Sequence, residues 1–304
     1  MIKLVVLDLD NTLYDWVGYY VPAFEAMVSE LQREHGVERE RLLDDFRRVH
    51  QSHGTSEYAF VLTELDVLRD VETLAATDAG VHPAIAAFRK KAGETLRLYD
   101  GVRDTLVRFR SQERGIVAYT DAMMAYADLR LEQLDVADLF DELVATRDHP
   151  VPQSADDQVS YFAPARFGAP TIARHSALDL AARKPDPAGL IALMRRWGVS
   201  PDETIYVGDS LSRDVAMAQA ANVHDVHAAY GQSYTPDLWD RLVRVTHWTP
   251  EDVARERRLA QDPIPPTHAI TSFPELIAVV ETLESDRTIR AHPRIGTAVA
   301  SGRR

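Results

Sequence analysis

The fold is decided at the N-terminus, where residues 1–15 read M-I-K-L-V-V-L-D-L-D-N-T-L-Y-D. The apolar residues between positions 2 and 7 are rich in β-branched side chains, which is typical of a strand buried on both faces of a sheet. Two carboxylates, Asp8 and Asp10, follow this run, and the hydroxyl of Thr12 comes next. Burying carboxylates beside a strand is costly unless they are paired, hydrogen-bonded or bound to a metal. The stretch therefore indicates either a polar turn after the first strand or a metal site.

Composition excludes several classes of protein. The 304 residues suffice for one large domain or two moderate ones, and 45% of them are hydrophobic, as in ordinary globular proteins. A net charge of −13 argues against a general nucleic-acid binder. The absence of cysteine excludes disulfides, thiolate zinc sites and thiol nucleophiles. Because no leader-like or membrane-spanning apolar run occurs, we expect a cytoplasmic protein without membrane contact.

Residues 14–98 change character and show a helical pattern. Apolar side chains recur there at spacings of three and four, as at Val21, Phe24, Val28 and Leu31. Further helices are predicted over the ranges 42–49, 58–68 and 84–98. A block of helices therefore interrupts a domain that begins with a strand.

The strand-led pattern resumes at residue 99. Short apolar runs predict strands over the ranges 115–119, 140–145, 204–207 and 223–229, with a last short strand from residue 269. Helical segments separate these runs, and this alternation predicts an α/β fold with a doubly wound parallel sheet. Two irregular, aromatic segments, 147–180 and 231–266, are interpreted as insertions, and residues 285–304 as a flexible tail.

Polar side chains stand at the ends of three predicted strands. Asp8 and Asp10 end the first run, Thr120 ends the run over 115–119, and Asp209 ends the run over 204–207. In a doubly wound sheet the ligand crevice lies outside the carboxyl ends of the strands. We therefore expect these side chains to converge on one site.

The chain resembles the haloacid dehalogenase-like (HAD) hydrolases, because the four motifs of that family occur in order. They are D-L-D-N-T at 8–12, Thr120, Lys184 ahead of Pro185, and G-D-S-L-S-R-D at 208–214. The resemblance covers most of residues 1–230, and the helical block lies where one subfamily carries its helical C1-type cap. It implies a Rossmann-like core, residues 1–13 and 99–284, with a cap over residues 14–98.

The resemblance also implies a role for each motif residue. Asp8 would attack phosphorus to form an aspartyl-phosphate, and Asp10 would be the general acid and then the general base. Lys184 and Thr120 would stabilise the transferring phosphoryl group. The implied Mg²⁺ ligands are Asp8, Asp209 and the backbone carbonyl of Asp10, with Asp214 in the outer sphere.

We thus expect a Mg²⁺-dependent phosphomonoester hydrolase that acts on a small phosphorylated metabolite. A phosphomutase and a non-catalytic protein that binds a phosphorylated ligand remain alternatives. A 2-haloacid dehalogenase is disfavoured, since it would need neither the metal nor the acid at Asp10. The two insertions leave substrate choice open, and they are also candidates for a homodimer face.

Overall fold

The computed structural model describes residues 1–69, 82–150, 171–178, 182–233, 235–251 and 264–291, together with Ala254 and Arg258. Most of the predicted insertion at 147–180 and the end of the predicted tail, 292–304, lie outside these residues. None of the described helices is both long enough and apolar enough to cross a membrane.

The core is a parallel sheet whose described strands run in the order β4-β3-β2-β1-β5-β6-β7. Its strands are β1 (Leu4–Leu7), β2 (Gly115–Met123), β3 (Glu142–Thr146), β4 (His175–Leu178), β5 (Thr204–Gly208), β6 (His224–Ala228) and β7 (His268–Ile270). The first strand of the chain lies at the centre, paired with β2 on one side and β5 on the other. The predicted doubly wound α/β fold is confirmed.

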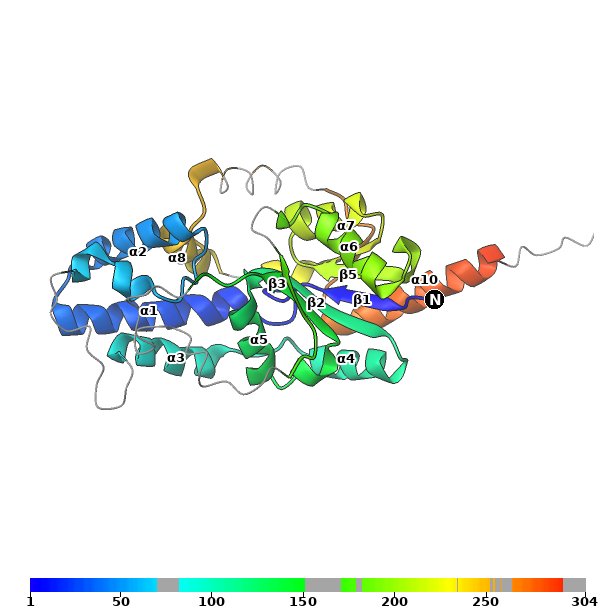
Figure 1. Ribbon diagram of the computed structural model, residues 1–304, viewed down its shortest axis with the longest axis horizontal. Coiled ribbons are helices and arrows are strands. Elements are labelled where there is room, and N and C mark those ends of the chain that lie inside the picture. The colour runs from blue at the N-terminus through cyan, green and yellow to red at the C-terminus, as the bar shows by residue number, and fades with distance from the viewer. Residues whose placement is uncertain are drawn as a thin grey trace, which may run out of the picture.

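Helices cover both faces of the sheet (Figure 1). They are α4 (Val102–Ser111), α5 (Met124–Gln133), α6 (Ala188–Trp197), α7 (Ala216–Ala220) and α10 (Leu276–Ala291). Val5 and Leu7 belong to one hydrophobic cluster, which includes residues of α4, α5 and α10. Leu4 and Val6 belong to another, with residues of α6 and α7. The alternation of side chains along β1 thus builds both halves of the core.

Three details differ from the sequence-based expectations for the core. The edge strand β4 was not predicted, because His175 and Ser176 give it no apolar run. Strand β2 continues to Met123, so Thr120 lies within the strand and not at its end. The last helix continues to Ala291 and so extends into the range 285–304 that was predicted as a tail.

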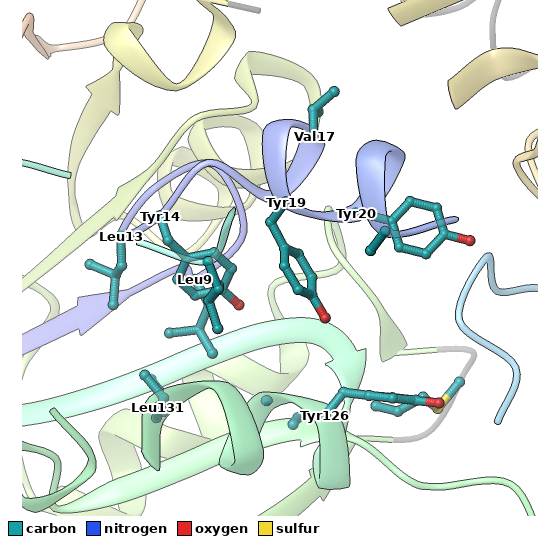
Figure 2. Close-up of a cluster of buried hydrophobic side chains, with 14 of the residues drawn as sticks. Leu9, Leu13, Tyr14, Val17, Tyr19, Tyr20, Tyr126 and Leu131 are labelled. Carbon is teal, nitrogen blue, oxygen red and sulfur yellow. The ribbon is translucent and has the colours of Figure 1, made fainter. Parts of the chain in front are cut away.

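The helical block lies beyond the carboxyl ends of the strands (Figure 1). It contains α1 (Trp16–His35), α2 (Arg39–His53) and α3 (Pro83–Thr95), with α1 packed against α3. The predicted helix over 58–68 is wrong in type, since that range holds two short 3-10 helices, Val61–Glu64 and Asp66–Leu68. Side chains at the start of α1 and just before it belong to the same hydrophobic cluster as side chains of α5; Figure 2 shows Tyr14 and Tyr19 on one side of this cluster and Tyr126 and Leu131 of α5 on the other.

One further helix, α8 (Pro236–Val245), belongs to the predicted insertion at 231–266. In the chain it lies between two core strands, yet it packs against α1 and α2 of the helical block (Figure 1). His50 Nδ1 donates a hydrogen bond to the carbonyl oxygen of Val245 over 2.7 Å. Arg244 forms ion pairs with Glu40 and Asp44 at 2.9 and 2.8 Å. Through α8, this insertion therefore connects the core to the helical block.

Candidate active site

All six residues predicted for the site line one pocket of about 370 Å³. They are Asp8, Asp10, Thr120, Lys184, Asp209 and Asp214. Asp8 follows the central strand β1, and its backbone N–H donates to the carbonyl oxygen of Val207 on β5 over 2.9 Å. Asp209 follows β5 itself, so the adjacent parallel strands deliver both carboxylates to the same edge.

Asp8 and Asp214 share the ammonium group of Lys184. Lys184 Nζ donates to Asp8 Oδ1 and lies 2.7 Å from Asp214 Oδ1. All three side chains are buried. Burial lowers the pKa of Lys184, but the carboxylates of Asp214 and Asp8 more than offset this effect and raise the pKa above its ordinary value. The lysine is therefore a fixed positive charge against one oxygen of Asp8. The other oxygen, Oδ2, accepts a hydrogen bond from the Thr12 hydroxyl over 3.0 Å.

Asp214 is held almost entirely by protein groups. The Tyr206 hydroxyl donates to its Oδ1 over 2.9 Å, and the Ser210 backbone N–H donates to its Oδ2 over 3.0 Å. A Cβ at Gly208 would overlap this carboxylate, which explains a glycine at the end of β5. With its oxygens engaged in this way, Asp214 is better suited to the outer sphere of a metal than to direct ligation.

Three carboxylates, from Asp8, Asp209 and Asp214, bring oxygen atoms within 4.8 Å of one another. Burial raises the pKa of Asp8 to about 7, Lys184 opposes this shift, and repulsion from Asp214 adds to it. Burial and the same repulsion raise the pKa of Asp209 well above its ordinary value. Such a cluster is short of positive charge and offers hard oxygen donors, so these residues fit Mg²⁺.

The carboxylate of Asp10 lies apart from that cluster and is oriented by two donors. The Tyr14 hydroxyl donates to Asp10 Oδ1 over 2.6 Å, and Arg130 Nη1 donates to the same oxygen over 3.0 Å. Arg130 lies on α5, is 1% exposed and also forms an ion pair with Glu57 of the helical block. Its guanidinium lies over the ring of Tyr19, 5.2 Å from the centroid. Asp10 therefore lines the pocket with one oxygen already engaged.

Sequence reasoning missed Arg130 and Glu57. Neither lies in a motif, and Arg130 sits in a helix pattern in which an arginine reads as a solvated side chain. A buried arginine is uncommon unless it is paired, so only its burial and its two carboxylate partners reveal its place in the site.

Asp121 stands beside Thr120 and connects two of the motifs. Its Oδ1 accepts from the Lys184 backbone N–H over 3.3 Å, and its Oδ2 pairs with Arg213. The Thr120 hydroxyl accepts from the Ala122 backbone N–H over 3.0 Å, which leaves its own proton available to a ligand. These contacts position the lysine-bearing loop against β2.

The insertion at 231–266 begins against the site. The Tyr230 hydroxyl donates to the carbonyl oxygen of Thr12 over 2.6 Å, and Gln232 Nε2 donates to the carbonyl oxygen of Asp209 over 2.9 Å. Gly231 between them lies so close to Asn11 that a Cβ would overlap its carbonyl oxygen. Farther along, Trp239, Leu242 and residues 246–248 line the pocket.

Comparison with known proteins agrees with this geometry. The family model of haloacid dehalogenase-like hydrolases matches residues 2–222, and a second model, described as HAD-hydrolase-like, matches residues 181–276. A phosphoglycolate phosphatase of Pseudomonas putida is 28% identical over 236 residues, covering 76% of this chain and 71% of that protein. A glyceraldehyde 3-phosphate phosphatase of Methanopyrus kandleri is 23% identical over 239 residues, covering 76% of this chain and 86% of that protein.

A solved structure with the same fold is a 2-haloacid dehalogenase from Pseudomonas syringae pv. tomato. It superposes with a TM-score of 0.52 at 19% identity, covering 93% of this chain and 99% of that one. The family model spans the central strand, the helical block and every motif of the pocket. The chain therefore belongs to the haloacid dehalogenase-like hydrolases.

Proposed function

We propose that this hydrolase is a Mg²⁺-dependent phosphomonoesterase that acts through an aspartyl-phosphate on Asp8. One observation carries the proposal. A buried carboxylate at the end of the central strand is paired with Lys184 and stands among further carboxylates in a pocket that also holds Asp10. The curated relatives named as phosphatases support the same reaction class.

Two displacements at phosphorus make up the proposed reaction. In the first, an oxygen of Asp8 forms a bond to phosphorus while the ester P–O bond breaks, and Asp10 gives its proton to the departing oxygen. In the second, Asp10 takes a proton from water as the water oxygen bonds to phosphorus. The bond between phosphorus and Asp8 then breaks, which releases phosphate and restores both carboxyl groups.

Asp10 is oriented for this double task by contacts that leave it one free oxygen. Tyr14 and Arg130 both donate to Oδ1, so Oδ2 can exchange a proton with the leaving group or with water. Lys184 and the Thr120 hydroxyl would stabilise negative charge on the phosphoryl oxygens.

The proposed metal ligands are Asp8, Asp209 and the backbone carbonyl of Asp10, with Asp214 acting from the outer sphere. When bound, the ion would reduce the repulsion between the Asp8 carboxylate and an anionic phosphate. The three clustered carboxylates and the raised pKa values of Asp8 and Asp209 support a cation at this place.

The helical block over residues 14–98 is proposed as the cap, and residues 1–13 with 99–284 as the core. Glu57, Trp16 and Ser56 of the cap line the same pocket as the core motifs. Such an arrangement excludes bulk water during turnover and favours a small phosphorylated metabolite over a protein chain.

Phosphate release from a panel of phosphomonoesters, with Mg²⁺ and with chelator, tests the proposal. We expect Mg²⁺-dependent release by the wild type and a loss of roughly a thousandfold or more in Asp8→Asn. Asp138→Asn is the matched control, because Asp138 is an exposed carboxylate outside the pocket. Undiminished release by a folded Asp8→Asn protein would overturn the mechanism, and product analysis separates hydrolysis from transfer to a second hydroxyl.

A further inference from the structure

The pocket extends from the phosphate end to an aromatic wall that no family motif supplies. This wall belongs to the α8 segment, defined here as residues 235–251, and presents Trp239, Leu242 and Trp248 to the pocket. The two indole rings lie with their centroids 5.2 Å apart at an angle of 41°. Both tryptophans are half-buried, and both line the pocket.

The α8 segment is held in place by the cap. Ser56 Oγ lies 3.0 Å from Thr246 Oγ1 and 3.0 Å from His247 Nδ1. The His247 backbone N–H also donates to Ser56 Oγ over 3.2 Å. Because Ser56 itself lines the pocket, these bonds fix the wall and the cap loop as one surface that faces the catalytic carboxylates.

Charged side chains of the core and of the cap line the pocket. Its lining cations, Arg183, Lys184 and Arg213, all come from the core. The described residues of the cap and of the α8 segment contribute no lysine or arginine to the lining, and the cap contributes the acidic Glu57. Arg183 Nη1 donates to the carbonyl oxygen of Gly54 in the cap loop over 3.1 Å, so one of these core cations extends to the cap.

We propose that the α8 segment is a leaving-group subsite that selects phosphate esters of alcohols bearing a flat ring. This inference rests on the proposed phosphomonoesterase function and specifies its substrate class. A ring stacked on Trp239 or Trp248 would gain the offset or edge-on contacts that aromatic pairs prefer. The volume of about 370 Å³ is in the range of pockets that enclose ring-bearing ligands and exceeds what a two-carbon acid fills.

Three esters with poor alkoxide leaving groups test the subsite: benzyl phosphate, glycerol 3-phosphate and phosphoglycolate. We expect kcat/KM to be at least roughly tenfold higher for benzyl phosphate than for phosphoglycolate. Trp239→Leu and Trp248→Leu should each lower kcat/KM about tenfold for benzyl phosphate and less than about threefold for glycerol 3-phosphate. Trp248→Phe, which keeps a ring, should restore most of the loss.

Arg241→Ala is the matched control, because Arg241 lies on the same helix, pairs with Asp237 at 3.0 Å and does not line the pocket. Preference for phosphoglycolate, or equal losses for all three esters in the tryptophan variants, would overturn the subsite while leaving the phosphomonoesterase intact. If the folded wild type hydrolyses no phosphomonoester, the proposed function itself fails. Calorimetric titration with benzyl phosphate then decides the subsite alone: binding weakened by Trp248→Leu supports it, and no binding overturns it.

Discussion

The side chain of Arg130 links the core to the cap beside Asp10, the proposed general acid. One guanidinium nitrogen donates to Asp10, and another pairs with Glu57. Burial raises the pKa of Glu57, and the arginine opposes that shift. A planar guanidinium can hold two carboxylates in fixed directions, which a lysine ammonium on its flexible stem does not. We therefore interpret Arg130 as a positioning residue: because it also pairs with Glu57, it holds Asp10 in an orientation that depends on the position of the cap.

Replacing Arg130 by lysine should lower kcat by roughly tenfold with a smaller change in KM, because Asp10 loses a fixed donor while the phosphate contacts remain. Arg130→Met should also destabilise the fold by about 3–5 kcal/mol, because the carboxylates of Asp10 and Glu57 lose their buried positive partner. Steady-state kinetics and urea unfolding measure both effects. Arg110→Lys, at an exposed pair with Asp141, is the control. A wild-type kcat in Arg130→Lys would refute the positioning role.

At the scale of elements, the contact between α2 and α8 decides where the aromatic wall stands. His50 is fully buried in this contact and donates from Nδ1 to the last residue of α8. Burial lowers the pKa of His50 to about 4. The hydrogen bond to Val245 acts in the opposite direction but is the weaker effect. The imidazole is therefore neutral in the native protein at physiological pH.

This shift predicts acid destabilisation with a definite sign. A histidine in the unfolded chain has a pKa of about 6.5, so below that pH the unfolded state takes up a proton that the native state refuses. The free energy of unfolding should therefore fall between pH 7 and pH 5, with about 2 kcal/mol of the loss due to His50.

Urea unfolding of wild type and His50→Gln at pH 7 and pH 5 measures that contribution. The difference between the two pH values should be smaller in His50→Gln, whatever the absolute stability of the variant. Gln51→Ala, at an exposed and non-titrating position of the same helix α2, should retain the wild-type difference. An unchanged difference in His50→Gln would show that this contact does not carry the acid sensitivity.

At the scale of the whole molecule, the proposed Mg²⁺ site lies where β1 and β5 end. A ligand that binds only the native state stabilises it by RT ln(1 + [L]/Kd), which is about 2.7 kcal/mol at a concentration a hundredfold above Kd. Added Mg²⁺ should therefore raise the Tm of the wild type. The rise should largely disappear in Asp209→Asn and persist in Asp138→Asn, and an equal rise in all three proteins would exclude Asp209 as a ligand.

The parallel arrangement of the strands explains why the core could be predicted from the sequence. The run ending at Asp8, the hydroxyl at Thr120 and the carboxylate at Asp209 are local signals, and parallel strands bring their carboxyl ends to one edge whatever the rest of the chain does. Sequence alone therefore determined the fold class, the family and the six motif residues that gather in the pocket. It failed at β4, which is an exposed edge strand without an apolar run.

Only the tertiary structure decided what surrounds those residues. Arg130, Glu57 and Trp248 lie far apart in the chain, and no periodicity or motif relates them to one another. Their positions follow from packing. A buried arginine must pair with carboxylates, and the α8 segment must bury its apolar side chains against the cap. The sequence thus determined the groups proposed for the chemistry, and the packing of the cap and α8 decided the shape and charge of the space that a substrate would enter.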